Sequence, residues 1–575
     1  IDVYCSFFNM VEYLTADGEF ISSAWAEQHS YLFEMNKSGE SIPCLNPLKR
    51  LEDGSYYEDF FIQKLSDVMR DYQFNGYHGA DGYTSPRITL AESDYSDDMV
   101  EQFIMSGNEM PAEEINLQCD GNPEELARRG EWIWMNRRKE WIQFYSDKWE
   151  SFWRKIIDVL HNDGRKVVFN TAWTKDPFEA LYRYGVDYKR IASAGIDAFI
   201  VESVTSSLTL GASGMEMDPH YDFMAMLMLI KAYVPDTKLI CLNAIQDTTE
   251  RWDTLRHAPT LLERDIYALS NVFYVNDQGE LSRCCAGFAA CLSDGIRSYE
   301  WEWIQERWNL GFEADPIRLL GASLVWSDRA FENQLDDYMG ERSWPAHKLT
   351  HELTAKGAPI YNVVNIRDID QFRGTLLVPN PHLLPEEELE AIMKYDSGPV
   401  ILIGHQMPTT CDASIQFVDN DRPYQLICTI LNREGLSTDE CTFEQNALNA
   451  LTDQAIFDPI VDQDPGSWVH SLPFQKVSDS FLFQCARVIA ECADSPKIVQ
   501  GADAIKVIAM KLKNDEYRLI IGNDHINYKE AQIEMEQDIT KAVVCTDFPG
   551  MPIKAGERSF QVRVPGRGMV IVNVH

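Results

Sequence analysis

The sequence predicts an α/β protein made of a (β/α)8 TIM barrel, a flavodoxin-like α/β domain and a small C-terminal β-sandwich. In the first part of the chain, apolar runs of strand length alternate with long amphipathic segments, which is typical of parallel strands joined by crossover helices. Further along, the pattern changes to a strand–helix–strand unit and then to short strands separated by turn residues. A chain of 575 residues is too long for one core, so we place domains at residues 1–346, 347–457 and 458–575.

Eight apolar runs in the first domain are candidates for the barrel strands, and eight is the number that closes such a barrel. They are residues 3–8, 74–83, 166–170, 198–203, 238–243, 271–277, 296–302 and 322–328.

The segments between these runs have helical periodicity, and several end in Gly or Asp-Gly, as helix C-termini commonly do. The predicted helices are residues 60–72, 141–164, 178–195, 221–234, 261–270 and 280–295.

The second domain is predicted from residues 361–404, which suggest a strand, a helix opened by Pro385 and three glutamates, and a second strand. The run GPVILIGHQ resembles the approach to a nucleophile elbow, but no Cys or Ser follows in a tight turn. We therefore expect a structural or oligomerisation role. The third domain is predicted from strand-like runs within residues 504–524, 541–548 and 560–575.

The net charge of −39 excludes nucleic acid and anionic membrane surfaces as natural partners, because both would be repelled. No run of 18 apolar residues predicts a membrane span. The 13 cysteines are scattered without a CxxC pair, which favours reduced thiols and a cytoplasmic location. A neutral or cationic small ligand fits this balance best.

Acidic side chains close two of the predicted barrel strands. Glu202 follows AFIV, and Glu300 and Glu302 lie in IRSYEWE. Active sites of (β/α)8 barrels lie at the carboxyl ends of the strands, and glycoside hydrolysis needs a pair of carboxylates. We predict Glu202 as the acid/base and Glu300 as the nucleophile, with Glu302 as its competitor. The alternative is that these are solvated or ion-paired residues at the rim.

Other polar and aromatic residues near strand ends are predicted to bind the sugar, because aromatic faces stack on pyranose rings and polar groups hold hydroxyls. The alternative is core packing or a turn. The predicted binding residues are His78, Asp81, Asn170, Trp173, Asn243, Trp301, Glu302 and Trp326. We find no HExxH, P-loop or dinucleotide fingerprint and no zinc spacing of His and Cys, so no metal or cofactor is predicted.

The order of the three domains resembles that of glycoside hydrolase family 42 β-galactosidases and related retaining glycosidases. The resemblance implies an acid/base on the fourth strand and a nucleophile on the seventh, which are the positions of Glu202 and Glu300. Val201 stands where the family has Asn before its acid/base. The resemblance also implies a homo-oligomer formed through the middle domain.

These observations predict a retaining exo-glycosidase, β-galactosidase-like, that acts on a short oligosaccharide or other glycoside. Three alternatives stay open: a phosphorylase with the same domain order, for which Arg297 or Arg329 is available to bind phosphate, an inverting hydrolase, and a carbohydrate-binding protein without catalysis.

Overall fold

The structure is a computed structural model that falls into two compact units. The first unit comprises residues 1–202, 234–239 and 459–473, and the second comprises residues 203–233, 240–458 and 474–575. The structure describes residues 1–9, 11–15, 19–80, 82–111, 117–172, 174–203, 219–248, 252–292, 295–408, 415–419, 425–431, 464–466, 470–549 and 553–575.

Four strands of the first unit are parallel neighbours within one sheet, and each confirms a strand predicted from the sequence. Their order is β1 (Tyr4–Phe7), β6 (Gly76–Gly79), β7 (Lys166–Asn170) and β8 (Ala198–Val201). In the register, His78 lies beside Val168, and Asn170 lies beside Ile200. Paired residues of neighbouring strands point to the same face, so this register decides which side chains share a face.

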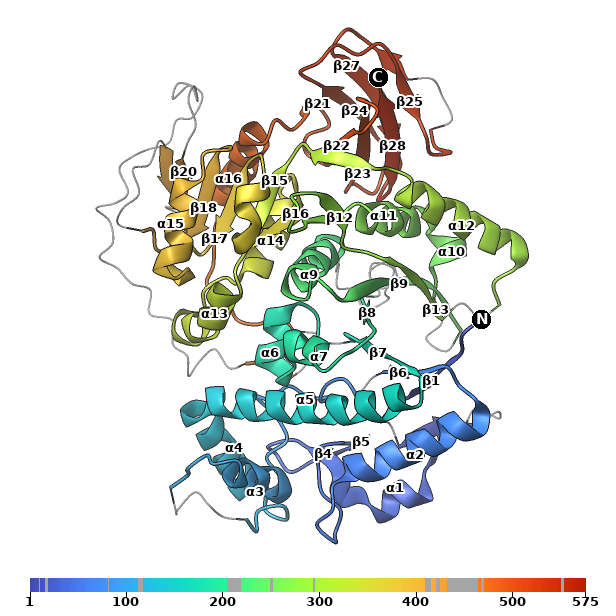
Figure 1. Cartoon of the computed structure of the whole chain (residues 1–575), viewed down its shortest axis with the longest axis vertical. Helices are drawn as coiled ribbons and strands as arrows, with labels where there is room; N and C mark the ends of the chain where they lie inside the picture. The colour runs from blue at the N-terminus through green and yellow to red at the C-terminus, as the bar shows by residue number, and fades with distance from the viewer. Residues whose placement is uncertain are drawn as a thin grey trace. The chain divides into compact units, whose positions relative to one another are not determined.

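Helices cover one face of this sheet. The long helix α5 (Arg138–Asn162) packs against β7, α2 (Tyr57–Tyr72) and α4 (Pro123–Asn136) (Figure 1). Its Trp153 ring centroid lies 6.1 Å from that of Tyr77 and 5.0 Å from that of Phe169. The helices of the first unit are α1 (Ala24–Gln28), η1 (Ser30–Leu32), α2 (Tyr57–Tyr72), α3 (Asp97–Met105), α4 (Pro123–Asn136), α5 (Arg138–Asn162), α6 (Pro177–Tyr184) and α7 (Tyr188–Ser193).

The predicted helix 178–195 is divided into α6 and α7 at Gly185. This glycine has φ +65° and caps α6, and a Cβ there would lie 2.4 Å from the Cβ of Tyr145. Both the backbone conformation and the close approach therefore favour glycine. Two hairpins complete the first unit: β2 (Glu12–Leu14) with β3 (Phe20–Ser22), and β4 (Phe33–Met35) with β5 (Ser41–Leu45).

The strand β9 (Lys238–Asp247), most of which belongs to the second unit, pairs with the parallel strand β13 (Gly287–Leu292) and the antiparallel β10 (Trp252–Asp253). The largest sheet of the second unit is mostly parallel and has a core of branched aliphatic side chains from neighbouring strands. The order is β12 (Leu281–Arg283), β11 (Phe273–Val275), β16 (Ile360–Asn365), β15 (Ala322–Trp326), β17 (Leu376–Pro379), β18 (Val400–Gly404), β20 (Ile427–Leu431) and β19 (Ile415–Val418).

This sheet corrects two assignments. The predicted barrel strands 271–277 and 322–328 contain β11 and β15, which both pair with β16. The sheet therefore extends across the predicted boundary between residues 346 and 347. A fully apolar strand has the same local pattern in a barrel as in an open sheet, so the sequence did not distinguish the two.

Two further assignments were wrong in element type. The predicted strand 296–302 lies at the start of α12 (Ser298–Phe312), whose buried residues Glu300, Ile304, Arg307 and Gly311 recur at helical spacing. The predicted helix 280–295 contains β12 and β13 instead. Short apolar runs do not separate helix from strand by periodicity.

Of the predicted helices in the second unit, 221–234 and 261–270 are confirmed by α9 and α11. All residues of α9 except Asp222 are buried, as expected for a helix that is apolar on every side. The helices are α9 (His220–Tyr233), α10 (Thr254–His257), α11 (Pro259–Leu269), α12, α13 (Asp328–Glu341), α14 (Ala346–Ala355), η2 (Ile366–Gln371), η3 (Pro381–Leu383), α15 (Glu386–Lys394) and α16 (Asp479–Cys492).

The C-terminal strands form two antiparallel sheets that share one apolar core, as a β-sandwich does. One sheet has the order β14 (Pro316–Leu319), β22 (Ile505–Leu512), β23 (Tyr517–Asn523), β28 (Met569–Val574) and β25 (Ala542–Val544). The other has the order β21 (Lys497–Gln500), β24 (Lys529–Glu534), β27 (Ser559–Val564) and β26 (Lys554–Ala555). The chain is thus an α/β protein with parallel strands consistent with a TIM barrel, a second α/β sheet and antiparallel sheets.

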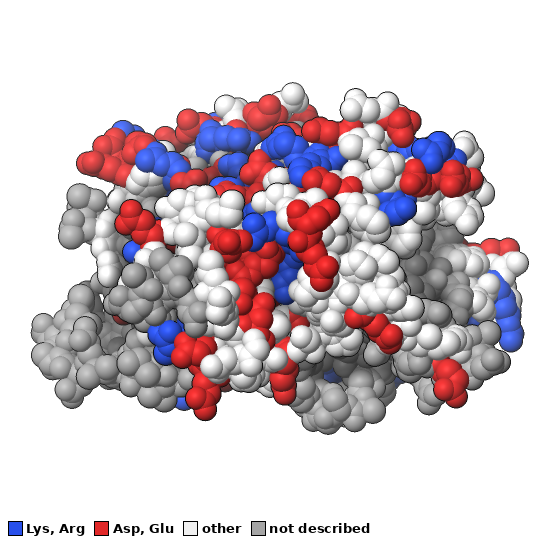
Figure 2. All heavy atoms as spheres, turned by 90° about the horizontal axis from the view of Figure 1, so that it is seen from below, with Lys and Arg blue, Asp and Glu red and all other residues white. Residues whose placement is uncertain are grey.

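The surface carries charges of both signs. On the face drawn in Figure 2, acidic side chains lie among basic ones, and many bases are ion-paired, such as Arg154 with Glu150. In the part of the chain that the structure describes, no helix is both long and apolar enough to cross a membrane.

Candidate functional site

The candidate site lies on the sheet face of the first unit that is opposite to α5 and α7. On the helix-covered face, Phe169 and Phe199 make inclined ring contacts with each other and with Tyr188 of α7. The alternation along each strand then places Ser6, His78 and Asn170 on the other face, where Glu202 continues the alternation beyond β8. This is the face that a barrel turns to its interior.

Asn170 and Glu202 touch each other at the carboxyl ends of β7 and β8. Asn170 Nδ2 donates to Glu202 Oε2 at 2.7 Å, and Asn170 Oδ1 accepts from the backbone N–H of Ala172 at 2.9 Å. Because a backbone N–H can only donate, it fixes the orientation of the amide, and the NH2 group must face the carboxylate. The Asn170 amide is therefore held in one orientation, with its NH2 group toward the carboxylate of Glu202.

The backbone of Glu202 is held as well. Its N–H donates to Thr171 Oγ1 at 3.1 Å, and the N–H of Thr171 donates to the carbonyl of Ile200 at 2.9 Å. Asn170 is buried, while Glu202 is partly exposed. Thr171 was missed in the sequence, although its place directly after a strand-ending Asn was a signal for it.

His78 lies on the same face, on β6, and is partly buried. Ser6 of β1 is beside it in the register and is exposed; it was not predicted. The predicted binding residues Asp81 and Trp173 lie outside the residues that the structure describes.

Glu300 does not close a strand; it stands in the first turn of α12. Arg256 donates to both carboxylate oxygens, from Nε at 2.7 Å and from Nη2 at 2.8 Å, and the backbone N–H of Arg297 donates to Oε2 at 2.8 Å. The hydrogen bonds from Arg256 and then from Arg297 lower the pKa of Glu300 to about 2. Glu300 is therefore ionised at neutral pH and serves as the N-terminal cap partner of α12.

Two neighbours of Glu300 that were predicted on a strand also lie on α12. Glu302 is exposed and Trp301 is 37% exposed. Their outward direction follows from the helical period, because Glu300 and Ile304 define the buried side.

Asn243 and Trp326 were predicted at strand ends, and both are buried. Asn243 lies within β9, which continues to Asp247, and its Oδ1 accepts from Trp308 Nε1 at 3.0 Å. Trp326 ends β15 and packs against Tyr233 and Phe331, with ring centroids at 5.6 and 5.5 Å. The alternative of core packing describes Trp326 better than sugar stacking, because its ring is only 4% exposed.

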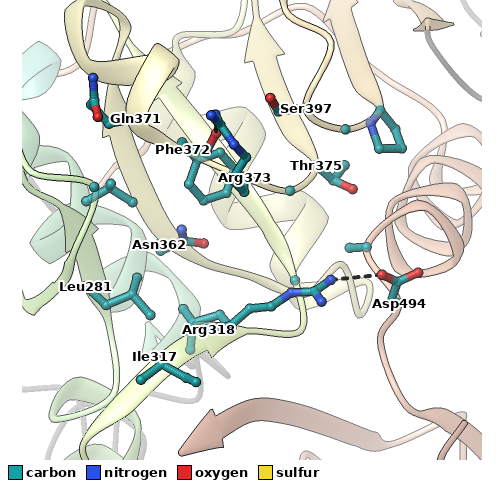
Figure 3. A pocket seen from close by; sticks show the side chains of 18 of the residues that line it. Leu281, Ile317, Arg318, Asn362, Gln371, Phe372, Arg373, Thr375, Ser397 and Asp494 are labelled. Carbon is teal, nitrogen blue, oxygen red and sulfur yellow. Dashed lines mark hydrogen bonds and ion pairs between the residues drawn. The ribbon is translucent and has the colours of Figure 1, made fainter. Parts of the chain in front are cut away.

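The second unit also has a cavity of about 650 Å³ (Figure 3). Arg318 and Asp494 face each other in it with an N–O distance of 2.9 Å, and Phe372, Arg373 and Asn362 contribute to its wall. None of the predicted site residues lines this cavity.

No model of a known protein family matches the sequence, and no curated protein matches it. Solved structures of glycosidases are similar to it at low identity and high coverage. A catalytic mutant of the GH42 β-galactosidase Gan42B from G. stearothermophilus has 10% identity over 96% of this chain and 86% of its own, with TM-score 0.47. The GH42 exo-carrageenase from Bacteroides ovatus has 11% identity over 100% and 75%, with TM-score 0.48. An α-L-fucosidase from Paenibacillus thiaminolyticus has 11% identity over 90% and 80%, with TM-score 0.43.

The resemblance predicted from the order of the domains is thus found as a distant structural similarity over most of the chain. Because the identities and TM-scores are low, the inference on function rests on this chain's own residues.

Proposed function

We propose that this protein is a glycoside hydrolase in which Glu202 is the general acid and base. The observation that carries the proposal is the hydrogen bond from Asn170 to Glu202 at the ends of two adjacent parallel strands, on the face away from the helices. The amide orients the carboxyl group of Glu202, which in this proposal protonates a glycosidic oxygen. A carboxyl group placed in this way protonates the leaving group and then takes a proton from water.

His78 and Ser6 lie on the same face of the sheet as Glu202. The imidazole of His78 and the hydroxyl of Ser6 are suited to hydrogen bonding with sugar hydroxyls. The retaining exo-glycosidase predicted from the sequence, with a neutral glycoside as substrate, is the specific form of this proposal. A net charge of −39 supports a neutral or cationic substrate rather than an anionic one.

The second carboxylate remains a prediction. Glu300 is the predicted nucleophile, and its ionised state at neutral pH suits that role. Its hydrogen bonds to Arg256 and Arg297 instead favour a role in holding α12. Substitution of Glu300 and of Glu302 separates these roles. Loss of a nucleophile lowers the turnover rate, whereas loss of a helix cap lowers the free energy of unfolding.

The test is hydrolysis of a panel of aryl α- and β-glycosides by the wild type and by Glu202→Ala. We expect activity on a poor leaving group to fall by about 10²–10⁴-fold, the usual contribution of general acid–base catalysis. We expect a smaller loss on a dinitrophenyl glycoside, which departs without protonation, and azide should restore turnover as a glycosyl azide. The anomer of the first product distinguishes retention from inversion.

The matched control is Glu124→Ala, an exposed glutamate on α4 of the same unit. Asn170→Ala should lower kcat/KM about 10–100-fold, because a hydrogen bond to a charged group contributes about 1.5–3 kcal/mol. Full activity of Glu202→Ala on every leaving group refutes the assignment. A wild type that binds sugars and never cleaves them favours the non-catalytic alternative, and turnover only with added phosphate favours a phosphorylase.

A further inference from the structure

Three side chains that the sequence analysis did not connect meet in the large sheet of the second unit. Asp337 lies on α13, which follows β15; His382 lies in η3, which follows β17; and His405 comes directly after β18. The strands β15, β17 and β18 are parallel neighbours. The three residues thus gather at the carboxyl ends of adjacent strands, where open α/β sheets bind their ligands.

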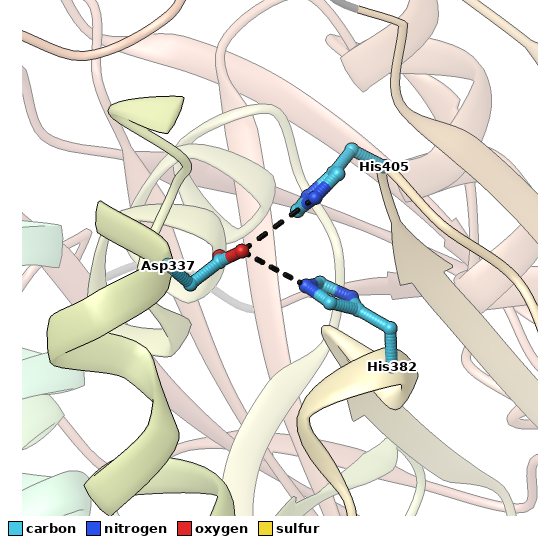
Figure 4. A group of neighbouring side chains, drawn as sticks. All are labelled: Asp337, His382 and His405. Carbon is cyan, nitrogen blue, oxygen red and sulfur yellow. Dashed lines mark hydrogen bonds and ion pairs between the residues drawn. The ribbon is translucent and has the colours of Figure 1, made fainter. Parts of the chain in front are cut away.

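The three side chains converge on one point (Figure 4). Asp337 Oδ1 lies 3.3 Å from His382 Nε2 and 3.6 Å from His405 Nε2. One ligand atom from each residue lies within 4.8 Å of the other two, and this is the one such group of His, Cys, Asp or Glu found among the described residues. The two imidazole rings have centroids 4.1 Å apart and are inclined by 67°.

We propose that Asp337, His382 and His405 bind a zinc ion. Zinc binds imidazole nitrogen and carboxylate oxygen at about 2.0–2.2 Å, so two tetrahedral ligands lie about 3.3 Å apart. The two distances from Asp337 match this separation to within a few tenths of an ångström. Two imidazoles also exclude magnesium and calcium, which prefer oxygen ligands.

A chain of hydrogen bonds orients the aspartate. Ser343 Oγ donates to Asp337 Oδ2, Gln334 Nε2 donates to Ser343 Oγ at 3.3 Å, and Asn380 Nδ2 donates to Gln334 Oε1 at 3.1 Å. Oδ1, the oxygen that faces both histidines, is left for the metal. Such supporting hydrogen bonds are what holds a ligating carboxylate in one direction.

The three side chains are largely shielded from solvent. The side chains of Asp337, His382 and His405 are 11%, 13% and 10% exposed, which shields the charge of the ion while leaving a path to solvent. Three protein ligands leave a fourth position for water or another oxygen ligand.

The alternative to a metal site is an aspartate that accepts hydrogen bonds from two histidines. The second unit contains such a case: Asp222 Oδ1 lies 3.1 Å from His347 Nε2 and 3.8 Å from His351 Nδ1, and this trio does not bring three ligand atoms together within 4.8 Å. His351 therefore supplies a matched control, a histidine of the same unit that faces a shared carboxylate.

The test is calorimetric titration of the full chain, freed of metal by a chelator, with Zn²⁺ alone, together with the visible spectrum of the Co²⁺-loaded protein. We expect one Zn²⁺ per chain and the intense d–d bands of four-coordinate Co²⁺. Asp337→Asn, His382→Gln and His405→Gln should each abolish the bands, Ser343→Ala should weaken zinc binding about 10–100-fold, and His351→Gln should leave both readouts unchanged.

Circular dichroism of each variant separates loss of the site from loss of the fold, and the wild-type titration with its Co²⁺ spectrum stands even if a variant fails to fold. The proposal is overturned if the wild type binds no Zn²⁺, if the spectrum is that of six-coordinate Co²⁺, or if His351→Gln removes binding while the three ligand variants keep it. The site shares no residue with the Asn170–Glu202 pair, so its failure leaves the proposed hydrolase untouched.

Discussion

At the scale of single residues, a missing side chain determines how closely α5 approaches the sheet. Gly79 ends β6, and a Cβ at this position would lie 2.1 Å from Cη2 of the fully buried Trp153. Real Cβ atoms do not approach so closely, so Trp153 or the strand would have to move. Glycine is required at Gly79 for space, whereas at Gly185 it is required for both space and backbone conformation.

We therefore expect Gly79→Ala to lower the free energy of unfolding by about 1–3 kcal/mol, the usual cost of overpacking a dense core. Urea unfolding followed by tryptophan fluorescence measures it. Gly121→Ala is the control, because a Cβ there meets nothing within 4 Å. Equal stability of the two variants would mean that Trp153 is free to shift.

The contact between Asn170 and Glu202 is also decided at this scale. Both were predicted as polar residues that close apolar runs, and that pattern is local. Their hydrogen bond depends on the register of β7 with β8, which pairs Asn170 with Ile200. A shift by one residue would turn one of the two side chains to the helix-covered face, and no local pattern encodes that register.

At the scale of elements, the start of α12 shows how a helix can be mistaken for a strand. SYEWEW alternates polar and aromatic residues, which is the strand period. Glu300 stabilises the helix instead. Its carboxylate accepts hydrogen bonds from the backbone N–H of Arg297, at the N-terminus of α12, and from the side chain of Arg256. Arg256 lies in α10, 44 residues earlier in the chain, so the signal was not local.

We expect Glu300→Gln to lower the free energy of unfolding at pH 7 by about 1–3 kcal/mol, because it replaces the charged partner of Arg256. The pKa of Glu300 is lowered to about 2, so its stabilisation is complete above the ordinary carboxyl pKa of about 4.3 and is lost as the pH falls toward 2. The difference between wild type and variant should therefore shrink from pH 7 to pH 3.

Glu302→Gln is the control for this prediction. Glu302 is the exposed neighbour on the same helix, and its substitution should change stability by less than about 0.5 kcal/mol. A Glu300→Gln protein with unchanged stability at pH 7 and lost turnover would instead support Glu300 as the nucleophile.

At the scale of the whole molecule, the excess of acids acts against the folded state. The chain has 90 Asp and Glu against 51 Lys and Arg, so repulsion is spread over the surface. Salt screens this repulsion and also the surface ion pairs, such as Arg128 with Glu125. Exposed pairs contribute little each, about 0–1 kcal/mol, so the net repulsion dominates.

We expect the Tm to rise when NaCl is increased from about 0.01 to 0.15 M, as the Debye length falls from about 30 to 8 Å. Differential scanning calorimetry in a buffer at constant pH measures this. A choline chloride series controls for specific binding of sodium. If the Tm falls with both salts, the ion pairs outweigh the repulsion.

Features that depend on local period and composition were predictable from the sequence. These are the four parallel strands of the first unit, the helices α2, α5, α9 and α11, the acidic charge, and Glu202 and Asn170 as residues that close apolar runs. The strands and helices follow from the spacing of apolar side chains within one helical turn or within a few residues of a strand. Such local patterns do not depend on contacts with the rest of the chain.

Contacts between distant parts of the chain set three other features. These are the sheet that includes β11 and β15, the helical state of residues 296–302, and the pairs of polar groups that meet. Asp337, His382 and His405 are separated by 45 and 23 residues and match no metal-binding spacing, yet the parallel pairing of three strands brings them together. Strand pairing joins residues distant in sequence through backbone hydrogen bonds that carry no side-chain signature. For that reason the sequence predicted the elements well and their partners poorly.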